Sequence, residues 1–353
     1  MISSLFHPPG KHSTRLLQRC VRLHRRGRGF RPAMGLSPQP EPGPHEVLIC
    51  VEAASLNHRD LLIAWGRYAG VEEGRIPLSD GAGTILALGS QVRGWHKGDR
   101  VMPAFFRDWL HGPYLPAYGV SALGGESDGV LARTVVMPEA ALVAVPAHLD
   151  CLAAATLPCA AVTAWQALFE RGRPLAAGET LLVQGTGGVA LFALQLGVAQ
   201  GARVILLSSS DAKLERARAL GAWGLINYRE RPDWDAEVLR LTEGVGAQHI
   251  LELGGAQTFQ RSLNCLAYGG RLAQIGVLSG GVARPDLGRL QRLNGSLEGI
   301  VVGSRAHLQR LVAYLELHRI EPVIDQVFHL DEVEQAYAHL ASGRHFGKVA
   351  IRI

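Results

Sequence analysis

A glycine-rich turn between an apolar strand and a helix is the feature that most limits how this chain can fold. The run Thr180-Leu-Leu-Val-Gln184 is followed at once by Gly185-Thr-Gly-Gly-Val-Ala190, which has the spacing G-x-G-x-x-A. In such a turn the first glycine permits a tight bend, the second lets the backbone approach a pyrophosphate, and the small last residue lets the helix pack on the strand. The start of the helix adds free N–H groups and partial positive charge. We therefore predict that a dinucleotide pyrophosphate is bound by Gly185, Thr186, Gly187, Gly188 and Val189.

Short strands and helices alternate from residue 179 onwards and give this turn its context. The predicted strands are Thr180–Gln184, Arg203–Leu207, Gly224–Ile226, His249–Leu253, Arg271–Ile275 and Leu297–Val301, with helical stretches between them. Six such strands predict an α/β fold with a doubly wound parallel sheet, a Rossmann domain. A glycine-rich turn alone also serves packing, but within this unit the cofactor interpretation is favoured.

The end of the second predicted strand bears on the choice of cofactor. An NAD site offers an Asp or Glu to the ribose about 20 residues after the glycines, whereas this chain has Ser208, Ser209 and Ser210 there. Hydroxyls can donate to a 2′-phosphate that a carboxylate would repel, so NADP(H) is favoured over NAD(H). Lys213 and Tyr228 are further candidate ligands of that phosphate. Two alternatives stay open: the serines cap the next helix, or Asp211 reaches the ribose.

Carboxyl ends of parallel strands are where doubly wound sheets bind their ligands. Gly254 follows the fourth predicted strand, and Gly276 and Val277 follow the fifth. We therefore add these three residues to the candidate cofactor site.

The remainder of the chain has β character. Alternating segments such as Glu46–Ala53 predict a small, mostly antiparallel β domain before residue 150. The chain returns to a strand at Gly347–Ile353, and this strand needs a partner. The first β domain is the economical partner, so we predict that the Rossmann domain is inserted between two parts of it. The expected boundaries are an extension at residues 1–20, catalytic pieces at 21–148 and 305–353, and the Rossmann domain at 149–304.

The net charge of +5 is concentrated at one end of the chain. Residues 1–40 hold eight Lys and Arg and no acidic residue, so the rest carries 28 basic against 31 acidic residues. This mildly acidic body gives no reason to expect nucleic acid as a partner, although binding through the basic arm stays a separate hypothesis. No apolar run reaches the roughly 18 residues that cross a bilayer, so we expect no membrane partner.

The five scattered cysteines indicate reduced thiols, and we expect a cytoplasmic protein. A mitochondrial location is the alternative if the Arg-rich start is a transit peptide.

Several motifs in the same order resemble one enzyme family. They are Ala53-Ala-Ser-Leu-Asn-His-Arg-Asp60, Pro77-Leu-Ser-Asp-Gly-Ala-Gly83, Lys97-Gly-Asp-Arg-Val101, Ala155–Trp165, the glycine turn and His345-Phe-Gly-Lys348. From about residue 41 the chain resembles the medium-chain dehydrogenase/reductase superfamily, and within it the zinc-independent, quinone-oxidoreductase-like alcohol dehydrogenases. The resemblance implies a GroES-like catalytic domain in two pieces around the Rossmann domain. It also implies a homodimer joined near Leu297–Val301, and a C-terminal cofactor clamp that includes Phe346 and Lys348.

The resemblance also locates the residues where zinc members of the superfamily hold metal. Asn57, Ser79 and Cys159 stand at the three ligand positions of the catalytic zinc, and the lobe that holds structural zinc corresponds to Ala104–Gly129, which has no cysteine. One soft ligand of three cannot form the usual site. We therefore expect no metal, and we expect Cys159 to line the site as a small apolar residue.

Without metal, side chains have to stabilise the charge that develops on the substrate oxygen as hydride arrives from the nicotinamide. By position, the Asn57 amide is the candidate donor, and Thr163 is expected to lie against the nicotinamide. Asp60 and His58 are candidates for proton transfer, although a helix-start carboxylate and a packed or solvent-facing histidine are the plainer interpretations. An aromatic wall for a flat substrate is a further hypothesis, against ordinary core packing; its members are Trp65, Tyr68, Phe105, Phe106 and Trp109.

Three functions are consistent with these residues. The first is an NADPH-dependent, zinc-independent reductase of quinones, enones or carbonyls, acting on a small molecule. The second is a zinc-type alcohol dehydrogenase. The third is a protein that binds NADPH without turnover, such as a sensor or a crystallin-like protein.

Overall fold

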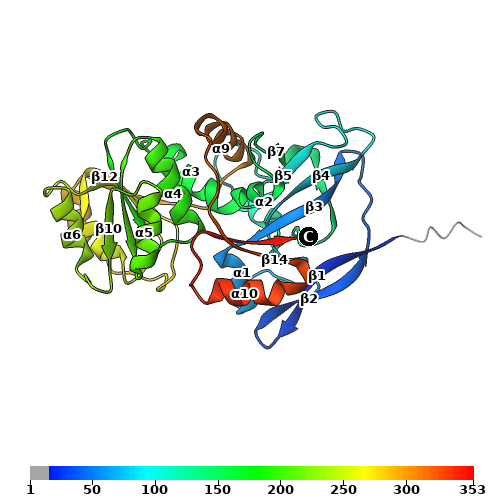
Figure 1. The fold of residues 1–353 in the computed structure, drawn as a ribbon, viewed down its shortest axis with the longest axis horizontal. Helices are drawn as coiled ribbons and strands as arrows, with labels where there is room; N and C mark the ends of the chain where they lie inside the picture. Colours follow the sequence, from blue (N-terminus) through cyan, green and yellow to red (C-terminus); the bar gives the residue numbers. More distant parts are fainter. Residues whose placement is uncertain (1–15) are drawn as a thin grey trace, which may run out of the picture.

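Two sheets that belong to two domains organise the molecule (Figure 1). The computed structural model describes residues 16–353. The predicted N-terminal extension therefore lies outside the described residues up to residue 15, as do the first 15 of the 40 residues that prompted the transit-peptide alternative.

The first sheet is parallel, six-stranded and ordered β10-β9-β8-β11-β12-β13. Its strands are β8 (Thr180–Gln184), β9 (Arg203–Ser208), β10 (Gly224–Asn227), β11 (Ala247–Glu252), β12 (Leu266–Gln274) and β13 (Ser296–Gly299). This confirms the predicted Rossmann sheet. The strand order reverses at β8, and doubly wound sheets bind ligands at the carboxyl end of that switch point. The glycine turn leaves β8 there.

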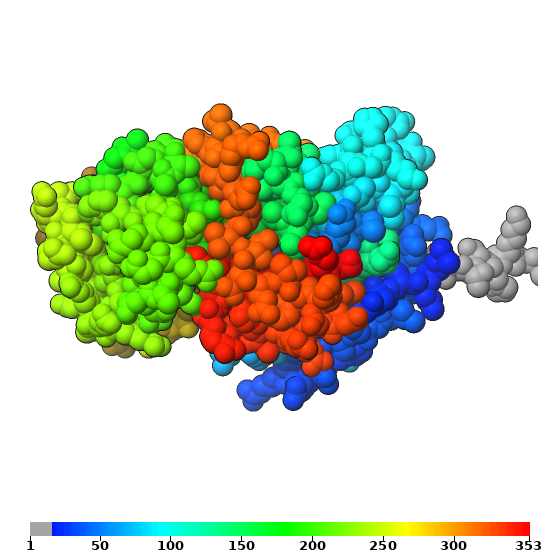
Figure 2. Space-filling view, viewed as in Figure 1, coloured from blue at the N-terminus to red at the C-terminus, as the bar shows by residue number. Residues whose placement is uncertain are grey.

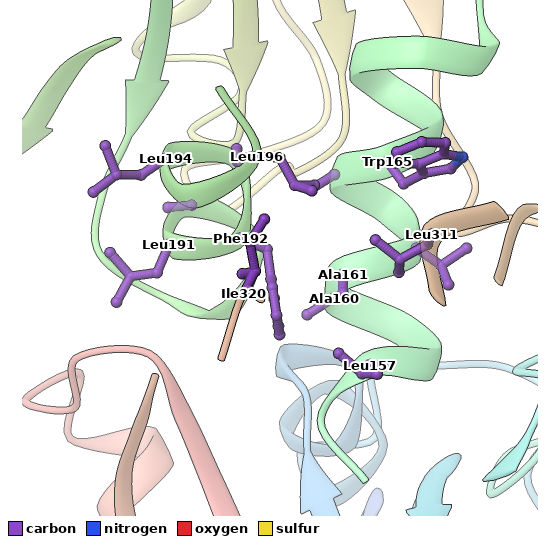
Figure 3. Close-up of a cluster of buried hydrophobic side chains, with 14 of the residues drawn as sticks. Leu157, Ala160, Ala161, Trp165, Leu191, Phe192, Leu194, Leu196, Leu311 and Ile320 are labelled. Carbon is purple, nitrogen blue, oxygen red and sulfur yellow. The ribbon is translucent and has the colours of Figure 1, made fainter. Parts of the chain in front are cut away.

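Helices cover both faces of this sheet. They are α4 (Gly188–Ala199), α5 (Asp211–Ala219), α6 (Trp234–Leu241), α7 (Phe259–Asn264), α8 (Leu287–Arg292) and α9 (Arg305–His318). The side chains of α4 pack against Ala160, Ala161 and Trp165 of the preceding helical segment (Figure 3). That segment is not one continuous α-helix. It consists instead of α2 (Cys151–Ala154), a π-helical turn (Leu157–Ala161), α3 (Val162–Trp165) and a second π-helical turn (Gln166–Glu170). Pro158 lacks an N–H and therefore interrupts the regular hydrogen-bond ladder.

The second sheet has the order β14-β15-β3-β4-β5-β7, with β6 also paired to β3. Its strands are β3 (Glu46–Leu56), β4 (Asp80–Leu88), β5 (Arg100–Pro103), β6 (Thr134–Pro138), β7 (Leu142–Ala144), β14 (Ile324–His329) and β15 (Lys348–Arg352). The C-terminal strand β15 pairs antiparallel with β3, with Val349 opposite Leu56. This pairing confirms that the Rossmann domain is an insertion, and the orange and red C-terminal residues lie between the two domains in Figure 2.

Short helices complete this domain. They are α1 (His58–Ala64), α10 (Val333–Ala341) and 3-10 turns at Pro116–Ser121, Glu139–Ala141 and Leu330–Glu332. Helix α1 begins directly after β3, so it places the residues after Asn57 beside the carboxyl end of that strand. None of the helices within residues 16–353 combines the length and the apolar character that a membrane crossing requires.

The N-terminal boundary of the catalytic domain was predicted wrongly. A hairpin of β1 (Leu17–Arg26) and β2 (Gly29–Pro38) begins at residue 17, so residues 17–20 belong to the domain and not to an extension. Gln18 and Cys20 are buried whereas Arg19 between them is exposed, which is the alternation of a half-buried strand. The arginines of this hairpin also find acidic partners, since Arg19 pairs with Asp331 and Arg31 lies 2.7 Å from Glu334.

Candidate functional site

The glycine turn has the backbone geometry that dinucleotide binding needs. Gly185 has φ 82°, a left-handed conformation that favours glycine. Gly187 is the N-cap of α4, and a Cβ on Gly188 would lie 2.7 Å from Lys348 Cδ and 3.1 Å from Ala160 Cβ. Glycine is therefore favoured at residue 185 by the backbone conformation and at residue 188 by the lack of space for a side chain.

A buried carboxylate holds the loop beside this turn. Glu252, at the end of β11, accepts hydrogen bonds from Gln184 Nε2 at 2.7 Å and from the hydroxyls of Thr258 and Ser262. It also accepts from the backbone N–H groups of residues 254 and 255, at 2.9 and 2.8 Å. The carboxylate is fully buried and accepts from these five donors. Hydrogen bonds of this kind stabilise a buried carboxylate in a protein interior. This network fixes the predicted cofactor residue Gly254 next to the glycine turn.

Gly276 lies at the same edge of the sheet. Its backbone N donates to Glu252 O at 3.1 Å, and a Cβ there would lie 2.3 Å from Leu253 O. The loops after β11 and β12 therefore approach each other closely. Val277, the next residue, is exposed on that edge.

The three serines at the end of β9 and after it differ in their burial and their contacts. Ser208 is buried, and its Oγ accepts from Ser210 N at 3.3 Å. Ser209 and Ser210 are half-buried, and Ser210 is the N-cap of α5. Tyr228 lies next to them because its backbone N donates to Ser208 O at 3.0 Å. Asp211 accepts from Asn227 Nδ2 at 2.8 Å, so one oxygen of its carboxylate is engaged by the last residue of β10.

The C-terminal segment that contains the predicted clamp residues lies against α5. The Phe346 ring is buried, with the Arg216 guanidinium 4.1 Å from its centre. Lys213 Nζ donates to Gly343 O and His345 O at 2.8 and 2.9 Å. Lys213 thus holds the C-terminal segment against α5.

Lys348 joins the two domains at the centre of the site. Its stem covers Gly188, and its ammonium is buried and donates to Asn57 Oδ1 at 2.7 Å and to Leu56 O at 2.8 Å. The carboxylate of Asp80 lies 3.6 Å from this ammonium and accepts from Cys159 N at 3.2 Å. A buried cation is thereby paired and hydrogen-bonded, as burial requires.

This arrangement fixes the orientation of the Asn57 amide. An ammonium only donates, so the atom that faces Lys348 has to be the amide oxygen. The amide nitrogen Nδ2 is then turned away from Lys348, and it is buried without a hydrogen-bond partner among residues 16–353.

The neighbours of Asn57 divide into a structural and a solvent-facing group. Asp60 is buried and accepts from Asn57 N at 2.7 Å, which completes a capping box at the start of α1. Burial raises the pKa of Asp60 to about 6, and the nearby Arg59 opposes that rise. His58 lies at the surface, with its ring beside Trp65. The part of the ring that is covered by protein loses hydration, which lowers the pKa of His58. The plain interpretations of both residues therefore have direct support from the contacts.

The Thr163 hydroxyl is engaged within its own helical segment. It is buried and donates to Cys159 O at 2.7 Å, one helical turn earlier. Burial raises the pKa of the Cys159 thiol, so the thiol stays protonated, as expected of a small apolar lining residue.

The aromatic residues separate into distinct groups. Phe105, Phe106 and Trp109 form one buried cluster that Cys159 packs against. Tyr68 packs elsewhere, against Leu23, Phe30 and Ile63, and Trp65 is 44 % exposed. Only the first group borders the site, so the continuous wall of five residues is wrong.

Comparisons with known proteins identify the family. Residues 43–147 match the family described as alcohol dehydrogenase GroES-like domain, and residues 188–316 match the family described as zinc-binding dehydrogenase. The chain is 43 % identical over 316 residues to a zinc-type alcohol dehydrogenase-like protein of Schizosaccharomyces pombe, covering 88 % of this chain and 91 % of that one. The chain belongs to the medium-chain dehydrogenase/reductase superfamily.

Two further matches agree. A quinone oxidoreductase of Pseudomonas aeruginosa is 32 % identical over 323 residues, covering 88 % of this chain and 92 % of its own. The crystal structure of a putative alcohol dehydrogenase from Sinorhizobium meliloti superposes with a TM-score of 0.90 at 41 % identity, covering 96 % of this chain and 99 % of that one. The protein is therefore an NAD(P)-dependent oxidoreductase of this superfamily.

Two contributors to the site were not among the predicted site residues. Asp80 and His345 both stand in quoted motifs, but their roles depend on partners far away in the sequence. Asp80 had one available signal: an acidic residue directly before the small-residue run Gly81–Gly83 of a buried strand has to find a buried partner.

Proposed function

We propose that this protein uses NADPH to reduce a quinone, an enone or another carbonyl compound, without a metal ion in the reaction. The observation that carries this proposal is the Asn57 amide, which Lys348 orients so that its N–H groups are unpaired beside the cofactor turn. When bound, the nicotinamide supplies a hydride. A preorganised donor near the substrate oxygen then stabilises the negative charge that develops there.

The residues at the metal positions do not fit zinc. Asn57 offers an amide whose oxygen already accepts from Lys348, and Ser79 Oγ donates to Asp80 Oδ1 at 2.7 Å. Cys159 remains as one soft ligand, whereas a catalytic zinc site uses three protein ligands. Within residues 16–353 no group of three His, Cys, Asp or Glu side chains converges on a common point. The ammonium of Lys348 also puts a fixed positive charge beside the ligand positions, which disfavours a second cation.

The preference for NADPH rests on the residues around β9. Ser209 and Ser210 leave the position of the ribose uncharged, and Asp211 is engaged with Asn227. Lys213 follows these serines on α5, and the backbone N of Tyr228 donates to Ser208 O. A 2′-phosphate that reaches Lys213 would add a hydrogen bond between two charged groups, which is stronger than a bond from the ammonium to a neutral carbonyl.

The edge strand β13 supports a homodimer as the oligomeric state. Leu297 on this strand and Val301 after it are each 45 % exposed, and an unpaired strand edge with apolar side chains favours pairing with a second copy. Leu297→Glu should convert a dimer to a monomer in light scattering, and a monomeric parent would contradict the proposal.

Asn57→Asp tests the proposed reaction. The carboxylate keeps the shape and the bond from Lys348 but has no N–H to donate, so kcat should fall by about 10²–10³ while the NADPH dissociation constant changes little. Asn294→Asp makes the same chemical change at an exposed position and should keep the parent rate.

Metal analysis of the parent enzyme, purified without chelator, completes the experiment. Stoichiometric zinc with activity that is lost on chelation would favour the zinc-type alcohol dehydrogenase, and no turnover on any quinone, enone or aldehyde would favour the non-catalytic alternative.

A further inference from the structure

The C-terminal segment at residues 343–347 is bound to the glycine turn through its main chain. Gly347 N donates to Thr186 O at 2.9 Å, and Gly347 forms a β-bridge with Gly187. On the other side, Lys213 holds the carbonyls of Gly343 and His345. The backbone on both sides of the His345 side chain is therefore fixed against the turn.

The His345 ring lies next to the residue that approaches the pyrophosphate. A Cβ placed on Gly187 would be 3.9 Å from His345 Nε2, which is ordinary van der Waals contact. The other ring nitrogen, Nδ1, is buried and has no hydrogen-bond partner among residues 16–353. A phosphate group on the N–H groups of residues 187 and 188 would come within reach of this ring.

We propose that His345 is a ligand of the cofactor pyrophosphate and that its ring takes up a proton from solvent when the cofactor binds. The inference rests on the proposed function only in requiring that a dinucleotide occupies the glycine turn. It adds a pH-dependent contact to the cofactor clamp.

The charges around His345 give the direction of this proton transfer. The pKa of His345 is lowered to about 4, first by burial and then by the charges of Lys213, His339 and Lys348, while Asp325 opposes them. His339 is bonded to Asp325 at 2.8 Å, and Arg216 lies 3.6 Å from the same carboxylate. The ring is therefore neutral at neutral pH when no cofactor is present.

Two phosphate charges beside the ring favour its protonated form and raise its pKa in the complex. Between the free and the bound pKa, binding takes up protons, so affinity increases as pH falls through this interval. Above the bound pKa the ring is neutral in both states, and below about 4 it is charged in both. The pH dependence from this residue is confined to the interval between them.

Calorimetric titration of the full-length protein with NADPH tests this proposal. Titrations in buffers of different ionisation enthalpy, at about pH 6 and about pH 8.5, give the number of protons bound with the cofactor. The 2′-phosphate of NADPH titrates in the same range, so the quantity that counts is the difference between parent and variant. His345→Gln should remove a fraction of a proton, at most about one, at the lower pH. It should also weaken NADPH about tenfold there and less at the higher pH.

Two further variants make the result decisive. His339→Gln removes a nearby histidine that is bonded to Asp325. The ring centre of His339 is 6.4 Å from that of His345. This variant should leave most of the proton uptake in place. His345→Lys carries a permanent charge and should restore affinity without the proton uptake. If His345→Gln takes up as many protons as the parent, or if His339→Gln abolishes the uptake, His345 is not the site. Absence of any binding heat in the parent would instead reject the dinucleotide site on which both proposals depend.

Discussion

Lys348 shows how much of this site depends on a single side chain. Its stem lies over the start of α4, its ammonium orients Asn57, and its charge is balanced by Asp80. Lys348 begins β15, and its partners come from the start of α4, the β3–α1 junction and the start of β4, so the glycine turn and the Asn57 amide are positioned by the same residue. Removal of one partner of a buried ion pair usually costs about 3–5 kcal/mol, which makes conservative replacements at Asn57 more informative than truncation of Lys348.

Asp60 provides a test of the electrostatics at the residue scale. Its pKa is raised from 3.8 to about 6 in the folded protein, so folding favours the protonated carboxyl. Stability from this group is fully present below the unfolded value and is lost as pH rises through the folded value. A shift of this size corresponds to about 3 kcal/mol. Asp60→Asn, which keeps an acceptor for Asn57 N, should therefore gain about 2 kcal/mol relative to the parent on going from pH 4 to pH 7, because the unfolded carboxyl is already more than half ionised at pH 4.

Urea unfolding at the two pH values measures this difference. Asp233→Asn, at an exposed carboxyl without a cap hydrogen bond, is the control for removal of a charge and should show little change between the two values. If the free energies of unfolding of Asp60→Asn and the parent differ by the same amount at both pH values, the raised pKa of Asp60 is contradicted.

At the scale of elements, the helical segment before β8 and helix α4 form the contact that positions the turn. Phe192 of α4 is 2 % exposed and lies against this segment (Figure 3). Phe192→Ala should destabilise the protein by about 3–5 kcal/mol, because it leaves a cavity in a close-packed core. Leu317→Ala, at a position 77 % exposed on α9, should cost less than about 0.5 kcal/mol. Equal effects of the two substitutions on chemical unfolding would mean that this contact is not part of the core.

The elements that could be predicted from sequence are those with strong local signals. Strands β8 and β9 are nearly continuous apolar runs, and the glycine spacing marks the turn between β8 and α4. Strand β2 carries Pro32 and Gly35, which strands disfavour, and its place depends on pairing with β1. The Lys348–Asn57 bond joins residues 291 positions apart. No local pattern encodes such a contact, so the orientation of Asn57 and the roles of Asp80 and His345 required the folded structure.

At the scale of the whole molecule, the chain order explains why the site forms between the domains. The catalytic domain begins the chain, the Rossmann domain follows, and β15 returns to pair with β3. The returning segment crosses the glycine turn through Gly347 before it enters the catalytic sheet. The glycine turn and the catalytic sheet are therefore connected by one short piece of backbone, and movement of one domain against the other affects both.

The central claim is that the turn at residues 185–189 binds the pyrophosphate of NADPH, and paired titrations with NADPH and NADH test it most directly. We expect NADPH to bind at least about tenfold more tightly than NADH, since a charged hydrogen bond to the 2′-phosphate contributes about 1.5–3 kcal/mol. Ser210→Asp, tolerated as an N-cap of α5, should reverse that order, and Gly185→Val should abolish both affinities because φ 82° strains a branched residue. If the folded parent binds neither nucleotide, or if Gly185→Val binds NADPH as tightly as the parent does, the account is wrong.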